Sequence, residues 1–309
     1  MCKNRKAQTK EINIEQKVLL LLIRNISKMK LYPIETGNLK LDGGAMFGVV
    51  PKVLWSKVYP CDEKNLCNWS MRCLLIVDGE RKILIDNGIG EKQDEKWLRH
   101  YYLNGDATLE SSLAKTGYKP EDITDVVLTH MHFDHCGGSV KWNNDKTGYE
   151  LAFPNATYWT SQKQFDWAAN PNRREKASFL KENILPIQES GQLKLIDEEG
   201  EYIPNITFKL YDGHTNGQLI PHIKYDDKTI VFMADLMPSS AHIPMPWIMA
   251  YDTRPLQTLK DRERFYAEAL ENDYILFFEH DLYNEACTLE DTLKGVRVKE
   301  VGKLSDFIG

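Results

Sequence analysis

The chain has 309 residues, of which 42% are hydrophobic and 27% are charged, and its formal net charge at neutral pH is −6. This size and apolar content fit a single large α/β domain that can bury a core without disulfides. A nucleic-acid-binding protein is disfavoured, because Lys and Arg are interleaved with Asp and Glu, as in residues 261–264 (DRER), instead of forming a basic face.

The N-terminal segment, residues 1–28, is expected to lie outside the fold. Its aliphatic run, residues 18–23, is interrupted by Arg24, and no stretch of the chain approaches the length of a membrane-spanning helix. A basic start precedes this run, but the small-residue cleavage site of a signal peptide is missing. Met29 is an alternative start, so the catalytic domain is predicted over residues 29–309, with no membrane association.

The six cysteines show no C-x-x-C pair and no framework spacing. This pattern predicts reduced thiols in a cytoplasmic protein. A bridge between Cys61 and Cys67 would overturn that prediction of the compartment. Cys136 adjoins the most chemically dense segment of the chain, and a packing role is expected for it.

Strand and turn signals begin with a predicted hairpin. Residues 72–77 and 81–86 form two apolar runs joined at Asp78 and Gly79, which is a strong hairpin signal. A further apolar and β-branched run at residues 123–129 predicts a buried strand.

Helices are predicted between and after these strands. Residues 92–116 and 161–185 are charged and aromatic at mixed spacing, with an insertion-like loop around Pro171, and another helix is predicted over residues 256–271. Strands before and after a helical insertion favour two packed sheets covered by helices.

The densest chemical signal is residues 130–135 (HMHFDH), which place three imidazoles and one carboxylate in six residues. Since the chain has only eight His, a chance match to this spacing is improbable, although an incidental polar loop is the alternative. If the preceding strand ends near Thr129, His130 and His132 project to one side while Asp134 and His135 lie round the next turn. One loop can then serve two metal centres.

Three further candidate metal ligands follow predicted strands. They are His214, Asp235 and His280, after the apolar runs at residues 206–211, 229–234 and 274–278. Each signal is weak alone, because a His at a strand end is more often a hydrogen-bonded loop residue. Their order and their shared position after strands strengthen the joint interpretation.

In this order of motifs the chain resembles the metallo-β-lactamase-fold hydrolases, over roughly residues 30 to 285. The resemblance implies a four-layer αββα sandwich of the α/β class. It also implies that residues 84–88 (LIDNG) support the loop of residues 130–135, the metal loop. The ligand sets that it implies are His130, His132 and His214 for a first metal and Asp134, His135 and His280 for a second, with Asp235 bridging.

Nitrogen and oxygen ligands without thiolate suit two divalent metal ions, zinc first, with manganese, iron or cobalt as alternatives. A water shared by two such ions becomes a hydroxide that attacks an ester or lactone carbonyl. Asp134 would bind the second metal and return a proton to the leaving oxygen. The G-x-S-x-G element of serine esterases is absent, which argues against that chemistry.

Within the superfamily, residues 213–217 (GHTNG) and 277–281 (FFEHD) are most similar to the branch of acyl-homoserine lactone lactonases and methyl parathion hydrolase-like enzymes. The best-known lactonases of this branch have a Tyr three residues after the bridging Asp, where this chain has Pro238. We therefore expect His242, on the same loop, to be the catalytic substitute; a surface-loop His that contacts no substrate is the alternative. The branch also implies a possible homodimer.

Two segments rich in Met and aromatic residues are candidate pocket walls, residues 43–48 with Trp55 and residues 243–249. They suit an acyl or aryl group, or else belong to the core or a dimer interface. The predicted function is hydrolysis of a small lactone or ester, most of all an acyl-homoserine lactone. The alternatives are an aryl ester or phosphotriester hydrolase, a glyoxalase II-like thioesterase, for which no basic cluster near the ligands is evident, and an inert metal-binding scaffold.

Overall fold

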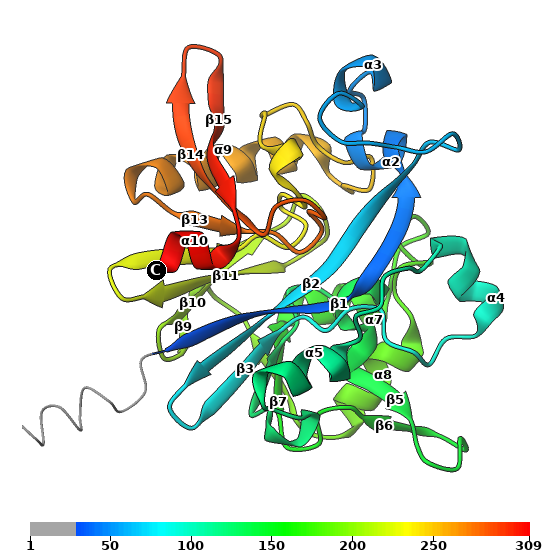
Figure 1. Ribbon diagram of the computed structural model, residues 1–309. Coiled ribbons are helices and arrows are strands. Elements are labelled where there is room, and N and C mark those ends of the chain that lie inside the picture. The colour runs from blue at the N-terminus through cyan, green and yellow to red at the C-terminus, as the bar shows by residue number, and fades with distance from the viewer. Residues whose placement is uncertain (1–28) are drawn as a thin grey trace, which may run out of the picture.

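Two β-sheets packed face to face form the centre of the fold (Figure 1). The structure is a computed structural model that describes residues 29–309, so the predicted N-terminal extension, residues 1–28, lies outside the described residues. In spatial order the first sheet contains β1 (Lys30–Asp42), β2 (Leu66–Asp78), β3 (Arg81–Ile85), β4 (Asp125–Val127), β7 (Thr157–Ser161) and β8 (Leu193–Ile196). The second contains β15 (Gly295–Gly302), β14 (Ala286–Thr292), β13 (Ile275–Phe277), β12 (Lys228–Phe232), β11 (Gln218–Tyr225), β10 (Ile206–Tyr211) and β9 (Gly200–Ile203).

The remaining elements of residues 29–309 are a small ribbon and the helices. The ribbon pairs β5 (Val140–Trp142) with β6 (Tyr149–Leu151). The α-helices are α2 (Gly43–Phe47), α3 (Lys52–Trp55), α4 (Glu95–Leu98), α5 (Leu109–Thr116), α6 (Phe133–Cys136), α7 (Gln162–Ala169), α8 (Lys181–Glu189), α9 (Pro255–Glu271) and α10 (Leu304–Ile308). Short 3₁₀ turns are η1 (Arg99–Tyr101), η2 (Pro120–Asp122), η3 (Gly137–Ser139) and η4 (Ser240–His242).

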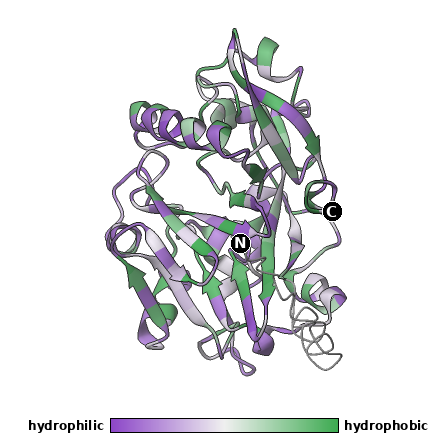
Figure 2. Cartoon of the chain, turned by 90° about the vertical axis from the view of Figure 1, so that its left-hand side faces the viewer, coloured by the Kyte–Doolittle hydropathy of each residue, from purple (hydrophilic) through white to green (hydrophobic). Residues whose placement is uncertain are grey.

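Strand β2 shows how the layers are built, because its alternate side chains enter different cores. Leu74 and Ile76 pack into the cluster shared with the second sheet, whereas Leu75 and Val77 pack into the cluster beneath α5, α7 and α8. Phe265 of α9 joins the cluster of the second sheet. The predicted αββα sandwich is therefore confirmed, and Figure 2 shows the hydrophobic residues along its strands.

The predicted hairpin is confirmed, since Asp78 pairs with Arg81 across the β2–β3 turn. The predicted helix over residues 256–271 is also confirmed, as α9. The predicted loop around Pro171 is confirmed as well. It separates α7 from α8, because Pro171 disfavours helical backbone at Asn170, whose φ and ψ are −129° and 64°. The helical prediction over residues 92–116 was too long. Residues 92–116 divide into α4, η1 and α5.

Strand direction decides where the loops meet. In the first sheet β3, β4 and β7 run parallel, and in the second β12 and β13 run parallel. Strand β10 has the same direction as β12, because each is antiparallel to β11. The segments that follow β3 and β4 therefore lie at one edge of the first sheet. Those that follow β10, β12 and β13 lie at one edge of the second sheet.

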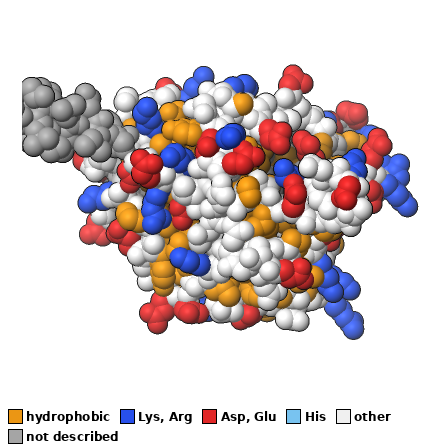
Figure 3. Space-filling model, turned by 90° about the horizontal axis from the view of Figure 1, so that it is seen from below, with side chains coloured by type: hydrophobic (Ala, Val, Ile, Leu, Met, Phe, Trp, Pro, Cys, Tyr) orange, Lys and Arg blue, Asp and Glu red, His pale blue; other side chains and the backbone are white. Residues whose placement is uncertain are grey.

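The surface and the cysteines agree with the expectations from the sequence. Figure 3 shows Lys and Arg interspersed with Asp and Glu on the face it presents. Within residues 29–309 no helix has the length and apolar character needed to cross a membrane. Cys61 and Cys67 are both free thiols, so the alternative of a bridge between them was wrong.

Gly137, directly after the metal loop, has no room for a side chain. A Cβ atom there would lie 2.1 Å from the carbonyl oxygen of Ile89, which is backbone and cannot swing away. We expect Gly137→Ala to lower the free energy of unfolding in urea by about 3 kcal/mol. Gly148→Ala is the matched control, because the nearest atom to its Cβ, Asn143 Nδ2, is at an ordinary 3.6 Å. Equal unfolding midpoints for the two variants would contradict this.

Candidate metal centre

The segment that carries most of the predicted ligands is anchored at its start by Asp86. Strand β3 lies parallel to β4, which places Asp86, just past the end of β3, beside Thr129, just past the end of β4. The Asp86 carboxylate accepts hydrogen bonds from the Thr129 backbone N–H (2.8 Å) and from its hydroxyl (2.6 Å). The support that the family resemblance implied for this loop is thus a pair of buried hydrogen bonds.

All seven predicted ligands lie together and are buried. Their candidate ligand atoms form two groups, each within 4.8 Å: His130, His132, His214 and Asp235 in the first, and Asp134, His135 and His280 in the second. Asp235 reaches both groups, since its Oδ2 lies 3.1 Å from His214 Nε2 and its Oδ1 lies 3.2 Å from His280 Nε2. The carboxylate predicted to bridge is therefore placed between the two groups.

The inward-facing atoms fit divalent cations. His132 Nδ1 lies 3.1 Å from His214 Nε2, and His135 Nε2 lies 3.1 Å from His280 Nε2. His130 Nε2 is buried and has no hydrogen-bond partner among the described residues. Buried polar atoms without partners are rare in folded proteins, and converging imidazole nitrogens and carboxylate oxygens are ligands that zinc and similar ions prefer.

The opposite nitrogen of each histidine lies within 3.5 Å of an oxygen atom. The contacts are His130 Nδ1 with Thr129 Oγ1 (3.1 Å), His132 Nε2 with Glu175 Oε1 (3.5 Å), His135 Nδ1 with Glu279 Oε2 (2.9 Å), His214 Nδ1 with Asp252 Oδ1 (3.1 Å) and His280 Nδ1 with the Ser70 carbonyl (2.8 Å). Such outer partners select the tautomer and the ring orientation of metal-binding histidines. Three of the five are carboxylates.

Sequence reasoning missed these three carboxylates. Glu279 directly precedes His280, so its position beside a predicted ligand was the one available signal. Asp252 and Glu175 lie in irregular segments, between η4 and α9 and between α7 and α8, where no strand or helix pattern marks them.

The local charges keep two of the carboxylates ionised. Burial alone would raise the pKa of Asp235, but the positive charges of His214, His135 and His280 outweigh it and hold that pKa well below its usual range. Burial opposes ionisation of Glu175 as well, yet the nearby His132 imidazole and the hydrogen bond from the Thr215 hydroxyl lower its pKa to about 2. Both groups are therefore anionic at neutral pH.

A cleft of about 470 Å³ opens onto the ligand groups. Its base contains His132, Asp134, His214, Asp235 and His280, and its walls include Leu41, Met46, Phe133, Met249, Tyr101, Arg174 and Tyr251. The two predicted wall segments therefore contribute only in part. Ala45 and Met46 line the cleft from the first and Met249 from the second, whereas Trp55 is buried in the core and stacks on Phe47 at 5.1 Å.

His242 is not at the cleft, and the prediction that it contacts substrate was wrong. Its side chain is fully buried and stacks on Phe47 at 4.6 Å. Its Nδ1 lies 2.7 Å from Ser239 Oγ and its Nε2 lies 2.9 Å from the Met46 carbonyl, so both ring nitrogens are occupied. Burial also lowers the pKa of His242 to about 3, which leaves the ring neutral.

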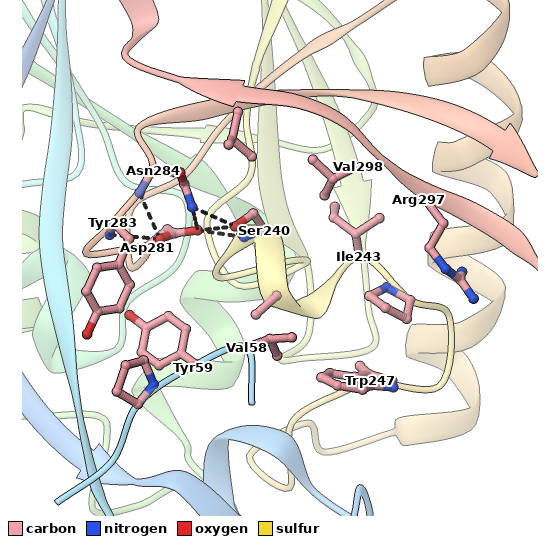
Figure 4. Close-up of a pocket in the computed structure, with 14 residues that line it drawn as sticks. Val58, Tyr59, Ser240, Ile243, Trp247, Asp281, Tyr283, Asn284, Arg297 and Val298 are labelled. Atoms are coloured by element: carbon pink, nitrogen blue, oxygen red, sulfur yellow. Dashed lines mark hydrogen bonds between the residues drawn. The ribbon is translucent and has the colours of Figure 1, made fainter. Parts of the chain in front are cut away.

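The loop of His242 instead lines a second cavity, of about 540 Å³, beside the last predicted ligand loop (Figure 4). Ile243 and Trp247 form one side of it, and Asp281 lies at another. Asp281 Oδ2 accepts a hydrogen bond from the Ser240 backbone N–H at 2.9 Å. None of the seven predicted ligands lines this cavity, so the cleft is the only one of the two that reaches them.

The fold agrees with comparisons to known proteins. Residues 72–280 match the model of the metallo-beta-lactamase superfamily. An N-acyl homoserine lactonase from Bacillus cereus is 24% identical over 234 residues, which cover 72% of this chain and 85% of the relative.

Solved structures have the same fold. The structure of a probable metal-dependent hydrolase from Staphylococcus aureus matches with 32% identity and a TM-score of 0.81, over 90% of this chain and 97% of that chain. AidC, a dizinc quorum-quenching lactonase, matches with 22% identity and a TM-score of 0.74, over 88% and 94% of the two chains. Since the family match covers more than half of its length, the chain belongs to the metallo-beta-lactamase superfamily.

Proposed function

We propose that this metal-dependent hydrolase uses two divalent ions, most of all zinc, to open lactones of the N-acyl homoserine lactone type or to cleave related esters. The observation that carries the proposal is the arrangement of seven nitrogen and oxygen ligands in two groups that share Asp235, at the base of a largely apolar cleft. The lactonase names of the sequence relatives support the substrate class. A homodimer and a cytoplasmic location stay predictions.

When bound, the two ions would supply an activated water and polarise the substrate carbonyl. The ligands assigned to them are the two groups described above. Asp134 Oδ2 lies 3.9 Å from His280 Nε2 and 4.0 Å from His135 Nε2, and the residue lines the cleft. Its carboxylate is therefore placed to take a proton from the attacking water and return it to the leaving oxygen.

The cleft walls suit an acyl chain. Leu41, Met46, Phe133 and Met249 present apolar side chains above the ligand groups. A volume of about 470 Å³ is in the range of small-molecule sites, and Met side chains adapt to flexible acyl groups. We assign the acyl portion of the substrate to this wall and the lactone ring to the base.

Tyr251 is the proposed hydrogen-bond donor to the substrate carbonyl. It would take the role of the Tyr that the best-known lactonases of the branch have at the position of Pro238, a role that the sequence had suggested for His242. Tyr251 lines the cleft and is 41% exposed, so its phenol is accessible to a ligand. Partial burial and the negative charge of Asp134 raise the pKa of Tyr251 to about 12. The phenol therefore keeps its proton at neutral pH and can donate it in a hydrogen bond.

A thioesterase of the glyoxalase II type is the second candidate, because one basic residue, Arg174, lines the cleft. Its sequence neighbours Arg173 and Lys176 are exposed. Such a group could bind the carboxylates of a peptide thioester.

Metal loading is the first test of the proposal. We expect chelator-treated protein to bind two equivalents of zinc and to gain roughly 10 °C in Tm at saturating zinc, because binding to the folded state stabilises it. His130→Ala should retain fewer than two equivalents, measured by elemental analysis after gel filtration. His100→Ala is the matched control, since His100 is exposed in η1, outside the cluster. Full loading of the His130 variant would contradict the ligand assignment.

Substrate class is tested with the zinc-loaded protein. We expect ring opening of a medium-chain N-acyl homoserine lactone, followed by proton release, and a loss of at least 100-fold in kcat/KM for Asp235→Asn, because the shared carboxylate is removed. Asp291→Asn, an exposed change in β14, should keep full activity. If both metals are bound and the lactone stays intact, the lactonase proposal fails, and turnover of a glutathione thioester, an aryl ester or a phosphotriester would identify the alternative.

The role of Tyr251 predicts a selective kinetic defect. Tyr251→Phe removes one hydrogen bond to the reacting carbonyl and should lower kcat/KM about tenfold without changing zinc content. Tyr283→Phe, at the rim of the second cavity, is the matched control and should be silent. Equal kcat/KM values for the two variants would remove Tyr251 from the mechanism.

A further inference from the structure

Glu175 lies in the segment between α7 and α8 and is 4% exposed, yet it belongs to neither predicted ligand group. Its Oε1 accepts a hydrogen bond from the Thr215 hydroxyl at 2.8 Å, and its Oε2 accepts hydrogen bonds from Trp167 Nε1 at 2.7 Å and from Asn172 Nδ2. Four side chains thus meet at one buried carboxylate, the fourth being that of His132, whose Nε2 lies 3.5 Å from Oε1.

We propose that Glu175 is a positioning residue: it orients His132 toward the first metal and fixes the α7–α8 segment as a wall of the cleft. The proposal rests on the two-metal function above. It adds to that function a carboxylate, outside the ligand set, that determines how tightly the first metal is held.

The geometry at His132 makes this role specific. Its Nδ1 faces His214 Nε2 at 3.1 Å and so points to the first ligand group. Once Nδ1 is used by a metal, the proton of the ring must reside on Nε2, and that buried atom has no hydrogen-bond partner among the described residues. The nearby Glu175 Oε1 is the acceptor within ion-pair distance, and a shift of a few tenths of an ångström completes the bond.

Glu175 is rigid enough for this task. The indole N–H of Trp167 and the amide of Asn172 hold one oxygen, so the carboxylate plane cannot rotate freely. The other oxygen is held by Thr215, the neighbour of ligand His214. One carboxylate therefore contacts a ligand of the first metal and also the loop that carries another.

The same segment reaches the cleft. Arg174, adjacent to Glu175, lines the cleft and donates a hydrogen bond to the Ala250 carbonyl, next to Tyr251. Because Thr215 and Trp167 hold Glu175, they also restrict the position of Arg174 on the cleft wall. A second carboxylate, Asp252, performs the equivalent contact for His214 at 3.1 Å, so two ligands of the first metal have a charged partner.

The test compares Glu175→Gln with wild-type protein in a zinc competition against a chromophoric chelator, together with the Tm of metal-free protein. The amide keeps the size of the side chain but carries no charge for His132. We expect one of the two zinc ions to bind 10- to 100-fold more weakly, the other to be unchanged, and the metal-free Tm to fall by about 3 °C, because the amide accepts fewer buried hydrogen bonds than the carboxylate. A role limited to loop anchoring would lower the metal-free Tm and leave both zinc affinities intact, which would overturn the proposal.

Two controls separate charge from anchoring. Trp167→Phe removes one donor to Glu175 but leaves the carboxylate, so it should bind both zinc ions as wild type does, and a defect equal to that of Glu175→Gln would count against the proposal. Glu189→Gln, exposed at the end of α8, is the matched charge change. If Glu175→Gln does not fold, Glu175→Asp replaces it with the same criteria. Wild-type protein that binds fewer than two equivalents would instead refute the proposed function.

Discussion

The hydrogen bonds between Asp86 and Thr129 are the constraint on which the site depends. Because β3 and β4 are parallel neighbours, these residues leave the sheet side by side, and the two bonds fix the start of the loop that carries four predicted ligands. Asp86 Oδ2 also lies 3.1 Å from His135 Nδ1. A single buried carboxylate therefore couples the sheet to the orientation of a ligand in the second group.

Charge balance explains why so many carboxylates surround the centre. An ionised carboxylate that is buried without a partner is costly, and here Asp86, Glu175, Asp252 and Glu279 stand behind histidines while Asp134 and Asp235 face the interior. Burial and the charge of Asp86 raise the pKa of Glu279 to about 8, although His135 opposes the shift, so this side chain is mostly protonated at neutral pH in the metal-free protein. Divalent cations at the interior would offset the negative charge of the other carboxylates, so metal binding and the stability of the loops are expected to be coupled.

The sequence predicted what is local and missed what is not. The spacing of residues 130–135 and the strand ends before His214, Asp235 and His280 are short-range patterns, and the structure brings all of them together. Glu175 and Asp252 come from irregular segments far along the chain, and no short-range pattern predicts that such residues pack against histidines. His242 was misplaced for the same reason, because a motif search does not reveal that a loop side chain turns inward.

The path of the loop after Asp235 accounts for both the error at His242 and the proposal for Tyr251. Buried Arg262 of α9 donates hydrogen bonds to the carbonyls of Leu236 (3.1 Å), His242 (2.7 Å) and Trp247 (3.0 Å), and so holds this loop against the core. With Pro238 in the loop and His242 turned toward Met46, its first part presents no donor to the cleft. The chain returns to the cleft only near Met249, where the Ala250 N–H bonds the Ala45 carbonyl at 2.8 Å and sets Tyr251 at the rim. A donor displaced this far along the loop would meet the substrate from a different direction than a Tyr three residues after Asp235, so the loop path, more than the metal ligands, is expected to decide which substrates fit.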